Sequence, residues 1–416
     1  MQLEQTFKLV KKASKTLGLM TDDERNNILN LVADAILSET PTLLEANARD
    51  LARMDKANPL YDRLQLTEAR LKEISDSMRQ VATLPSPLGH TLKHQVLDNG
   101  MDLKRVSVPF GVIGVIYEAR PNVTFDVFAL CLKSGNACTL KCGRDAADSC
   151  QAGVDLIHRV LQKEGVNPDI VTLLPPTHEA TAEMLQATDY VDLCIPRGGK
   201  RLINFVRDTA KVPVIETGAG VVHCYFDAEG DLNIGQKVID NAKTRRVSVC
   251  NALDTLIVHA GRLNDLPFLC KPLAEKQVRI HADERAFQAL QGNYPADLLT
   301  TINSNEEWHT EWLSMQMGLK TVSSIDEAIA HIDTYGSGHS ESIVTENKEA
   351  ARKFQDMVDA ACVYVNTPTS FTDGGQFGLG AEIGISTQKL GARGPMALEE
   401  MTTYKWLIEG RGQVRN

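Results

Sequence analysis

The sequence has no long apolar run and no paired cysteines. None of its 416 residues belongs to an uninterrupted apolar run of 18 residues, and its first residues lack the apolar core of a signal peptide. Its nine cysteines form no Cys-x-x-Cys pair. These absences argue against a membrane span, a disulfide scaffold and a structural zinc site. We therefore expect a protein of the reducing cytoplasm without a bound metal.

Positive charge is also in short supply. The chain has 44 Lys and Arg against 54 Asp and Glu, a formal net charge of −10 at pH 7. This balance argues against nucleic acid or an anionic membrane as a partner. A hydrophobic content of 43% with 24% charged residues is typical of soluble globular proteins, and the length suffices for two or three domains.

The glycine-rich dinucleotide fingerprint is missing as well. Gly-x-Gly-x-x-Gly would follow a strand and open a helix. The nearest match, Gly378-Leu379-Gly380 with Gly384, lies late in the chain and outside any expected strand–helix unit. Any nicotinamide cofactor must therefore be inferred from other residues.

Short apolar segments alternate with helical patterns in two parts of the chain. The first series runs over residues 108–227, and the second follows Cys250. Apolar strands joined by crossover helices indicate parallel sheets covered by helices on both faces. We predict an α/β protein with two doubly wound domains, over residues 1–245 and 246–385, and a C-terminal segment over residues 386–416.

Residues 94–107 carry a hairpin signal that interrupts the first domain. Asp98-Asn99-Gly100 separates two strand-like segments and is typical of a tight turn between antiparallel strands. A lone hairpin is only marginally stable in water. We therefore expect it to dock on another part of the molecule or on another subunit.

Cys250 is the candidate nucleophile of the chain. It follows Arg245 and Arg246 in a short polar turn and precedes a strand-like segment, whereas the other cysteines lie in apolar or helical segments. The thiolate is the reactive form of cysteine, and guanidinium groups near a thiol favour that form. The alternative interpretations are an inert core cysteine and a redox-sensitive group on a cofactor-binding scaffold.

Three motifs resemble those of the aldehyde dehydrogenase superfamily. Residues 216–220 (Glu-Thr-Gly-Ala-Gly), which begin thirty-four residues before Cys250, resemble the Glu-Leu-Gly-Gly motif that precedes its catalytic cysteine. Residues 120–124 are similar to the segment with its oxyanion-hole asparagine, and residues 140–144 to its lysine motif for the adenine ribose. Within the superfamily, nearly the whole chain resembles the branch of γ-glutamyl phosphate reductases, above all at residues 322–343, 371–382 and 393–395.

The resemblance implies the fold of that superfamily and the second step of proline biosynthesis from glutamate. L-Glutamyl 5-phosphate would be reduced by NADPH to L-glutamate 5-semialdehyde with release of phosphate. In such chemistry a thiolate displaces phosphate, the resulting thioester accepts hydride, and the thiohemiacetal collapses to the aldehyde. The resemblance assigns the thiolate to Cys250 and the oxyanion hole to Asn122, at an active site between the two domains.

Glu216 matches the glutamate that activates water in hydrolytic members of the superfamily. A reductase that releases phosphate must suppress that water, so Glu216 would either point away or position the thiol or the substrate. The residue keeps open the alternative of a hydrolytic NAD(P)-dependent aldehyde dehydrogenase. The absence of Phe-Gly-Pro near Glu311, where hydrolytic members carry Glu-x-Phe-Gly-Pro, argues against that alternative.

Cationic residues and glycines at two expected strand ends suit a cofactor. Lys141 and Arg144 follow one strand, three residues apart. An arginine at such a place accommodates the extra phosphate of NADP, whereas an acid favours NAD, so we predict NADP(H). Arg197, Gly198 and Gly199 end another strand and open a helix, whose backbone N–H groups suit a pyrophosphate.

The substrate's phosphate and amino-acid groups also need charged partners, because arginine is well suited to bidentate phosphate recognition. The candidates, which include one histidine in a glycine-rich turn, are Arg120, Arg245, Arg246 and His339.

Two expectations concern other proteins. The hairpin and the strand-like residues 405–408 resemble the elements with which these enzymes oligomerise, so a homo-oligomer is expected. The labile acyl phosphate would come from a separate glutamate kinase, and we expect a transient contact between the two enzymes.

Overall fold

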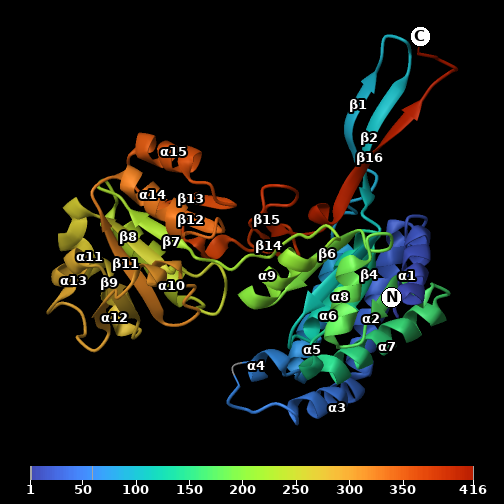
Figure 1. Ribbon diagram of the computed structural model, residues 1–416, viewed down its shortest axis with the longest axis horizontal. Helices are drawn as coiled ribbons and strands as arrows, with labels where there is room; N and C mark the ends of the chain where they lie inside the picture. Colours follow the sequence, from blue (N-terminus) through green and yellow to red (C-terminus); the bar gives the residue numbers. More distant parts are fainter. Residues whose placement is uncertain (1, 59, 416) are drawn as a thin grey trace. The chain divides into compact units, whose positions relative to one another are not determined.

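The computed structural model describes residues 2–58 and 60–415, which form two compact units (Figure 1). Unit 1 contains the chain up to Thr217, together with Gly378–Gly384 and the residues from Met396 onward. Unit 2 contains Gly218–Phe377 and Ile385–Pro395. The chain thus crosses between the units several times.

The first boundary between the units differs from the one predicted at residue 245. Helix α10 (Leu232–Thr244) precedes that position, yet its residues Val238, Ile239 and Ala242 pack into the hydrophobic core of unit 2. The spacing of apolar residues shows which face of a helix is buried, but not which sheet covers it. The predicted segment 386–416 is divided too, since residues up to Pro395 belong to unit 2.

Unit 1 begins with helices, as the apolar periodicity of its first residues predicts. Helix α2 starts at a capping box, in which the side chain of Thr21 accepts from the backbone of Glu24 and the reverse bond is also made. The helices are α1 (Glu4–Leu17), α2 (Asp22–Ser38), α3 (Thr40–Leu51), α4 (Tyr61–Leu64) and α5 (Glu68–Thr83).

Four parallel strands form the main sheet of unit 1, in the order β5-β4-β3-β6. The central strand β3 is buried along its whole length, as expected for a parallel strand covered on both faces. The strands are β3 (Val112–Tyr117), β4 (Ala137–Lys141), β5 (Val171–Leu173) and β6 (Leu193–Arg197). The helices between and after them are α6 (Asn122–Lys133), α7 (Ala147–Lys163), α8 (His178–Gln186) and α9 (Lys200–Thr209).

Seven parallel strands form the sheet of unit 2, in the order β10-β9-β11-β8-β7-β12-β13. They are β7 (His223–Phe226), β8 (Thr255–His259), β9 (Arg279–Ala282), β10 (Leu299–Thr301), β11 (Gln316–Val322), β12 (Ser340–Val344) and β13 (Cys362–Val365). The helices after α10 are α11 (Leu266–Leu269), α12 (Lys271–Glu275), α13 (Glu284–Leu290), α14 (Ile325–Tyr335) and α15 (Lys348–Met357).

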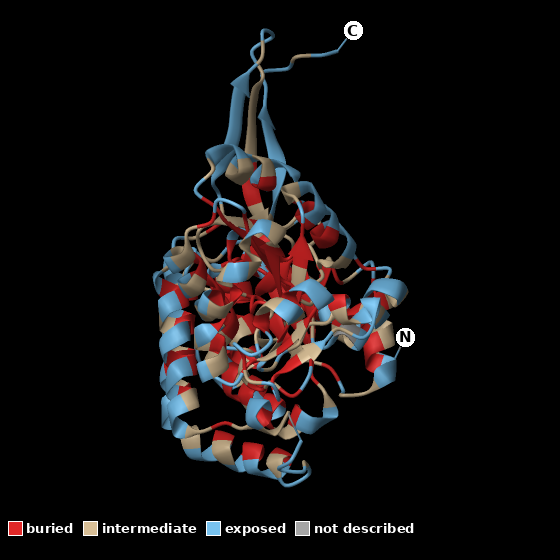
Figure 2. Cartoon of the chain, turned by 90° about the vertical axis from the view of Figure 1, so that its left-hand side faces the viewer, coloured by how far each residue is buried: buried red, intermediate tan, exposed pale blue. Residues whose placement is uncertain are grey.

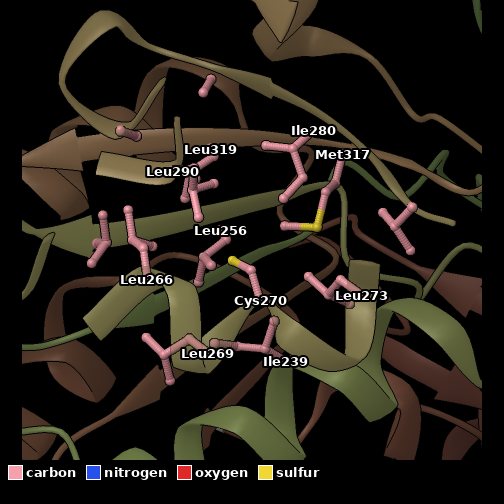
Figure 3. Close-up of a cluster of buried hydrophobic side chains, with 14 of the residues drawn as sticks. Ile239, Leu256, Leu266, Leu269, Cys270, Leu273, Ile280, Leu290, Met317 and Leu319 are labelled. Carbon is pink, nitrogen blue, oxygen red and sulfur yellow. The ribbon is translucent and has the colours of Figure 1, made fainter. Parts of the chain in front are cut away.

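Hydrophobic cores lie on both faces of the seven-stranded sheet. Figure 3 shows one of them, where Leu256 and Leu319 of the sheet lie near Ile239 and Leu269 of the helices. The other core joins the strands to α14 and α15, with Phe354 completely buried. This arrangement confirms the predicted doubly wound α/β architecture.

The predicted hairpin is confirmed, and it belongs to a three-stranded antiparallel sheet of unit 1. Its order is β1-β2-β16, with β1 (Thr91–Val96), β2 (Asp102–Pro109) and β16 (Thr402–Glu409). Figures 1 and 2 show this sheet extending away from the rest of the unit, largely exposed. A short two-stranded sheet pairs β14 (Gly384–Ser386) with β15 (Gly394–Met396).

A helix that crosses a membrane must be long and predominantly apolar. Within the described residues, no helix is both long and apolar enough to cross a membrane.

Candidate active site

Cys250 lies in the turn that joins α10 to β8 in unit 2. It is half-buried, whereas the other eight cysteines are buried. Arg245 and Arg246, at the start of the same turn, are both exposed. The turn therefore combines the most accessible thiol of the chain with two cationic side chains, the surroundings in which cysteine reacts as a nucleophile.

Gly220 packs directly against the backbone of Cys250. A Cβ atom at Gly220 would lie 1.6 Å from the carbonyl oxygen of Cys250, so no larger residue fits without moving the turn. The backbone N–H of Gly220 donates to Oε1 of Glu311 at 3.1 Å. Gly220 thus connects the backbone of Cys250 to Glu311, so that three segments distant in sequence meet here.

The residue after the nucleophile is anchored from another part of unit 2. The side chain of Asn251 donates to the carbonyl oxygen of Thr372 at 2.9 Å, and Thr369 Oγ1 donates to the carbonyl oxygen of Asn251 at 2.8 Å. Asn251 and Thr369 are both buried. These bonds restrict the movement of the Cys250 turn, as a positioned nucleophile requires.

A buried cation and a buried acid lie where the turn meets the sheet. The completely buried Lys243 donates to the carbonyl oxygen of Leu253 at 2.9 Å. Asp254 accepts from the backbone N–H of Trp312 at 2.9 Å and of Val222 at 3.2 Å. Burial lowers the pKa of Lys243 and raises that of Asp254, while the attraction between the two charges opposes both shifts.

Lys243 and Asp254 were not predicted from the sequence. The available signal was a lysine on the otherwise buried face of α10 and an acid at the start of an apolar strand.

His339, the residue immediately before β12, is completely buried. Its Nδ1 is 2.8 Å from Ser340 Oγ, which bonds to Thr372 Oγ1 at 2.7 Å, and Tyr364 also bonds to Thr372. Burial lowers the pKa of His339 to about 4, which favours the neutral imidazole. The histidine predicted to touch the substrate is therefore enclosed, and it is connected through Thr372 to the anchor of the Cys250 turn.

The predicted cofactor residues gather at one edge of the sheet in unit 1. Lys141 ends β4 and pairs with Ile116 of β3, while Arg197 ends β6 and pairs with Tyr117 of β3. Both lie at the carboxyl ends of neighbouring parallel strands, the edge at which open α/β sheets bind ligands. Lys141 is buried, and burial lowers its pKa.

Arg144 and two glycines extend this edge. Arg144 begins the 3₁₀ helix that follows β4 and is exposed. Gly198 and Gly199 are exposed, and Gly199 is the N-cap of α9 without a side-chain cap. The N-terminus of α9 thus presents backbone N–H groups of the kind that bind phosphate, so the residues at this edge fit a dinucleotide.

Asn122 is the first residue of α6, which follows β3 at the same edge. Its Nδ2 donates to Oδ2 of Asp126 at 3.0 Å. Burial raises the pKa of Asp126 to about 6, although the bond from Asn122 and the charge of Arg197 act in the opposite direction. Asp126 was not predicted from the sequence. Its position one helical turn after Asn122 was the only indication that the two side chains could meet.

Glu216 and Arg120 complete the predicted residues of unit 1. Glu216 is partly exposed and lies 4.0 Å from the guanidinium group of Arg207. The next residue, Thr217, donates to the carbonyl oxygen of Pro196 at 2.8 Å. Arg120 is partly buried, and its carbonyl oxygen accepts from the N–H of Val123 at the start of α6.

A metal site would need several ligating side chains close together. Across residues 2–58 and 60–415, no group of three or more His, Cys, Asp or Glu is arranged to hold a metal ion.

Comparison with known proteins relates the whole chain to one group of enzymes. A family model described as the aldehyde dehydrogenase family matches residues 310–407. The chain is 62% identical to γ-glutamyl phosphate reductase of Bacteroides thetaiotaomicron, with 99% of each chain covered. It is 60% identical to γ-glutamyl phosphate reductase of Pelodictyon phaeoclathratiforme, with 98% of this chain and 97% of the relative covered.

Solved structures agree with this relationship. The crystal structure of γ-glutamyl phosphate reductase from Thermotoga maritima matches with a TM-score of 0.95 and 39% identity over 100% of both chains. An acetylating aldehyde dehydrogenase from Geobacillus thermoglucosidasius shares the fold, with a TM-score of 0.69 at 16% identity.

Proposed function

Because the chain belongs to the γ-glutamyl phosphate reductases of the aldehyde dehydrogenase superfamily, we propose that it reduces L-glutamyl 5-phosphate to L-glutamate 5-semialdehyde with NADPH. Membership of this family makes it an oxidoreductase of proline biosynthesis that uses a nicotinamide cofactor. The observation that carries the mechanism is the half-buried Cys250, whose backbone packs against Gly220 in a turn that begins with two exposed arginines.

Cys250 performs the acyl transfer in this proposal. Its thiolate attacks the carbonyl carbon of the acyl phosphate, the new C–S bond forms, and the C–O bond to phosphate breaks with its electron pair leaving on phosphate. Arg245 and Arg246 suit the departing phosphate because guanidinium groups bind its oxygens through paired hydrogen bonds. The enzyme is left with an acyl thioester on Cys250.

The reduction of the thioester completes the reaction. NADPH, when bound, supplies the hydride that reaches the thioester carbon. The resulting thiohemiacetal collapses, so that the C–S bond breaks, the thiolate of Cys250 is restored and the aldehyde leaves. Both tetrahedral species carry an oxyanion, for which the side-chain amide of Asn122 and the backbone N–H of Cys250 are the proposed donors.

Several residues of unit 1 support a preference for NADP(H). We assign the 2′-phosphate of the adenine ribose to Lys141 and the exposed Arg144, and the pyrophosphate to Arg197, Gly198 and Gly199 at the start of α9. The preference is tested by comparing kcat/KM for NADP⁺ and NAD⁺ in the natural protein and in Arg144→Asp. We expect the substitution to lower the ratio.

The proposal includes two contacts with other protein chains. A separate glutamate kinase must supply the acyl phosphate, and because that compound is labile we propose a transient contact with it. The exposed sheet of β1, β2 and β16 is the proposed surface for homo-oligomer formation.

The reverse reaction tests the proposal. Purified protein is mixed with glutamate semialdehyde and NADP⁺, with and without phosphate, and NADPH formation is followed by absorbance for the natural protein and for Cys250→Ala. We expect turnover that requires phosphate and disappears in the variant.

The same experiment distinguishes the rival function. Steady turnover without phosphate would mean that water cleaves the thioester, and Glu216, which matches the base of hydrolytic aldehyde dehydrogenases, would then be its activator. Activity that survives in Cys250→Ala would contradict any mechanism based on this thiol.

A further inference from the structure

Asn122 and Asp126 form a side-chain pair one turn apart on the first part of α6. Nδ2 of Asn122 is 3.0 Å from Oδ2 of Asp126. The two residues share a helix face, as positions four residues apart do. Asp126 therefore touches the group that the proposed function assigns to the oxyanion hole.

The chemistry of the two groups decides how the amide of Asn122 is oriented. A carboxamide has one oxygen that only accepts and one nitrogen with two N–H donors, whereas an ionised carboxylate only accepts. Rotating the amide by half a turn would face its oxygen toward the carboxylate, with two acceptors in contact and no proton between them. Ionised Asp126 thus selects the rotamer in which the nitrogen faces it, and one N–H of Asn122 remains for another acceptor.

A cavity borders Asp126, although Asn122 is not among the residues that line it. It has a volume of about 150 Å³ and lies within unit 1. Asp126 and Phe125 of α6 line it together with residues of α5 and of the segment that contains Ala381 and Glu382. Most of the residues that line it are apolar, and Asp126 is buried enough that its pKa is raised, so its hydrogen bond from Asn122 replaces bonds that water would otherwise supply.

We propose that Asp126 is a positioning residue, whose carboxylate holds one N–H of Asn122 so that the second N–H donates to the oxyanion formed at the acyl group of Cys250. The inference rests on the proposed function, because it needs Asn122 to be the oxyanion donor. Asp126 itself contacts neither the reacting atoms nor the cofactor in this assignment.

A set of four variants tests the inference by single-turnover kinetics in the reverse reaction, with enzyme in excess over aldehyde. They are Asn122→Ala, Asp126→Asn, Asp126→Glu and the double variant Asn122→Ala/Asp126→Asn. Loss of an oxyanion donor lowers the rate by about 100-fold to 1,000-fold, so loss of its orientation should lower the rate by about 10-fold to 100-fold in Asp126→Asn. Asp126→Glu keeps an ionised acceptor and should recover much of this loss.

The double variant distinguishes positioning from a separate role. If Asp126 acts only through Asn122, removing its charge in the Asn122→Ala background slows the reaction by less than about 2-fold. A loss equal to the product of the two single losses would overturn the inference. So would an Asp126→Asn variant that is as fast as the natural protein, or one that changes KM alone.

A matched control comes from the same unit. Gln151 and Asp155 form another amide–carboxylate pair four residues apart, at 2.8 Å on the exposed side of α7. Asp155→Asn removes the same charge from the same kind of pair and should leave the rate unchanged.

Failure of the inference can be told apart from failure of the proposed function. Activity in Cys250→Ala, measured alongside, would remove the thioester mechanism itself. An inactive Cys250→Ala and a slow Asn122→Ala, together with a fully active Asp126→Asn, would leave the mechanism in place and contradict only the role of Asp126.

Discussion

At the scale of single residues, the surroundings of Cys250 explain why this thiol differs from the others. The other eight cysteines are buried, and burial raises the pKa of the thiols of Cys194, Cys224 and Cys270, which disfavours their thiolates. Cys250 is half-buried and lies in a polar turn that begins with the exposed Arg245 and Arg246, and guanidinium groups close to a thiol favour its thiolate. The identity of the flanking residues singled out this cysteine in the sequence, and its role as the nucleophile stays a prediction.

The pH dependence of the chemical step should report Asp126. Burial raises the pKa of Asp126 from 3.8 to about 6, so the carboxyl group takes up a proton as the pH falls through 6. The protonated group can donate as well as accept, and it no longer selects the orientation of the Asn122 amide. We expect the single-turnover rate of the natural protein to fall below pH 6 and this inflection to be absent in Asp126→Asn. An unchanged profile in the variant would contradict the assignment.

The groups around Asp126 define what else acts on this titration. Arg197 lowers the pKa of Asp126, and Glu382 lines the same cavity. The side chains that α5 contributes to the cavity, Ile74, Ser77, Met78 and Val81, carry no titratable group.

The raised pKa of Asp126 also predicts whether ionisation of this group stabilises or destabilises the folded protein. A carboxyl group whose folded pKa lies above its unfolded value favours the folded state below the unfolded pKa, and that contribution is lost as the pH rises through 6. At pH 7 the ionised group therefore disfavours folding. Asp126→Asn should be less active but no less stable than the natural protein in thermal unfolding, which excludes misfolding as the cause of a slow rate.

Removal of Lys243 should destabilise unit 2 strongly. Its ammonium group is completely buried near Asp254, and losing one partner of a buried pair leaves the other charge without compensation. We expect Lys243→Met to lower the free energy of unfolding by about 3–5 kcal/mol, measured by urea unfolding with the fluorescence of Trp308 and Trp312.

A more exposed pair between α10 and the end of α12 provides the comparison. Lys276 lies 2.7 Å from Asp240 of α10, with both side chains partly exposed. Lys276→Met should cost less than about 1 kcal/mol. Equal effects of the two lysine substitutions would contradict the account of the buried pair.

Residues of the site differ in how far the sequence could predict them. Lys141 and Arg197 were predicted at strand ends, and the structure places both at one edge of the parallel sheet, while their contact with a cofactor stays a prediction. His339 was expected at the substrate because it lies in a glycine-rich turn, but its bonding with Ser340 encloses it, and such long-range hydrogen bonding leaves no periodic signal. Asp126 required the phase of α6 and the neighbouring cavity, both of which depend on tertiary packing.

At the scale of elements, the approach of two backbones decides the position of the nucleophile. The segment before β7 passes so close to the turn before β8 that only glycine fits at residue 220. We expect Gly220→Ala to displace the turn and to lower the single-turnover rate by at least about 100-fold, since a displacement of 1 Å costs that much in catalysis. Circular dichroism would show the fold retained.

Gly18 offers a matched control for this substitution. A Cβ atom there would have its nearest neighbour at 3.8 Å, the carbonyl oxygen of Lys15. Gly18→Ala should keep full activity. If Gly220→Ala were equally active, the contact with Cys250 would have no bearing on catalysis.

The sequence predicts whether most segments form a helix or a strand, but not which other elements they pack against. Near-continuous apolar runs identified β3, β4, β8 and β12 because both faces of these strands are covered. The boundary between the units was predicted at residue 245, after α10, whereas this helix packs into the core of unit 2. Partner choice depends on packing between segments far apart in sequence.

At the scale of the whole molecule, the sheet of β1, β2 and β16 exposes an apolar stripe. Tyr404, Trp406 and Ile408 alternate along β16, share one face and are all exposed. Exposed apolar stripes of this kind mark protein interfaces. We propose that a second copy of the chain covers this face.

Two charged substitutions test that surface. We expect the Trp406→Glu/Ile408→Glu variant to sediment as a smaller species than the natural protein at equal concentration, because carboxylates would have to be buried in the interface. Leu390→Glu, which changes a highly exposed apolar residue outside β16, should leave the sedimentation unchanged. Identical sedimentation of the β16 variant and the natural protein would contradict the proposed interface.

The central claim is an acyl thioester on Cys250 that phosphate cleaves. The most direct measurement mixes the protein with glutamate semialdehyde and NADP⁺ without phosphate, quenches with acid and locates the acyl group by peptide mass spectrometry. We predict one glutamyl group on the peptide with Cys250, one NADPH formed per active site, and loss of the acyl group when phosphate is added before the quench. An unmodified Cys250 peptide, or repeated turnover without phosphate, would contradict the account.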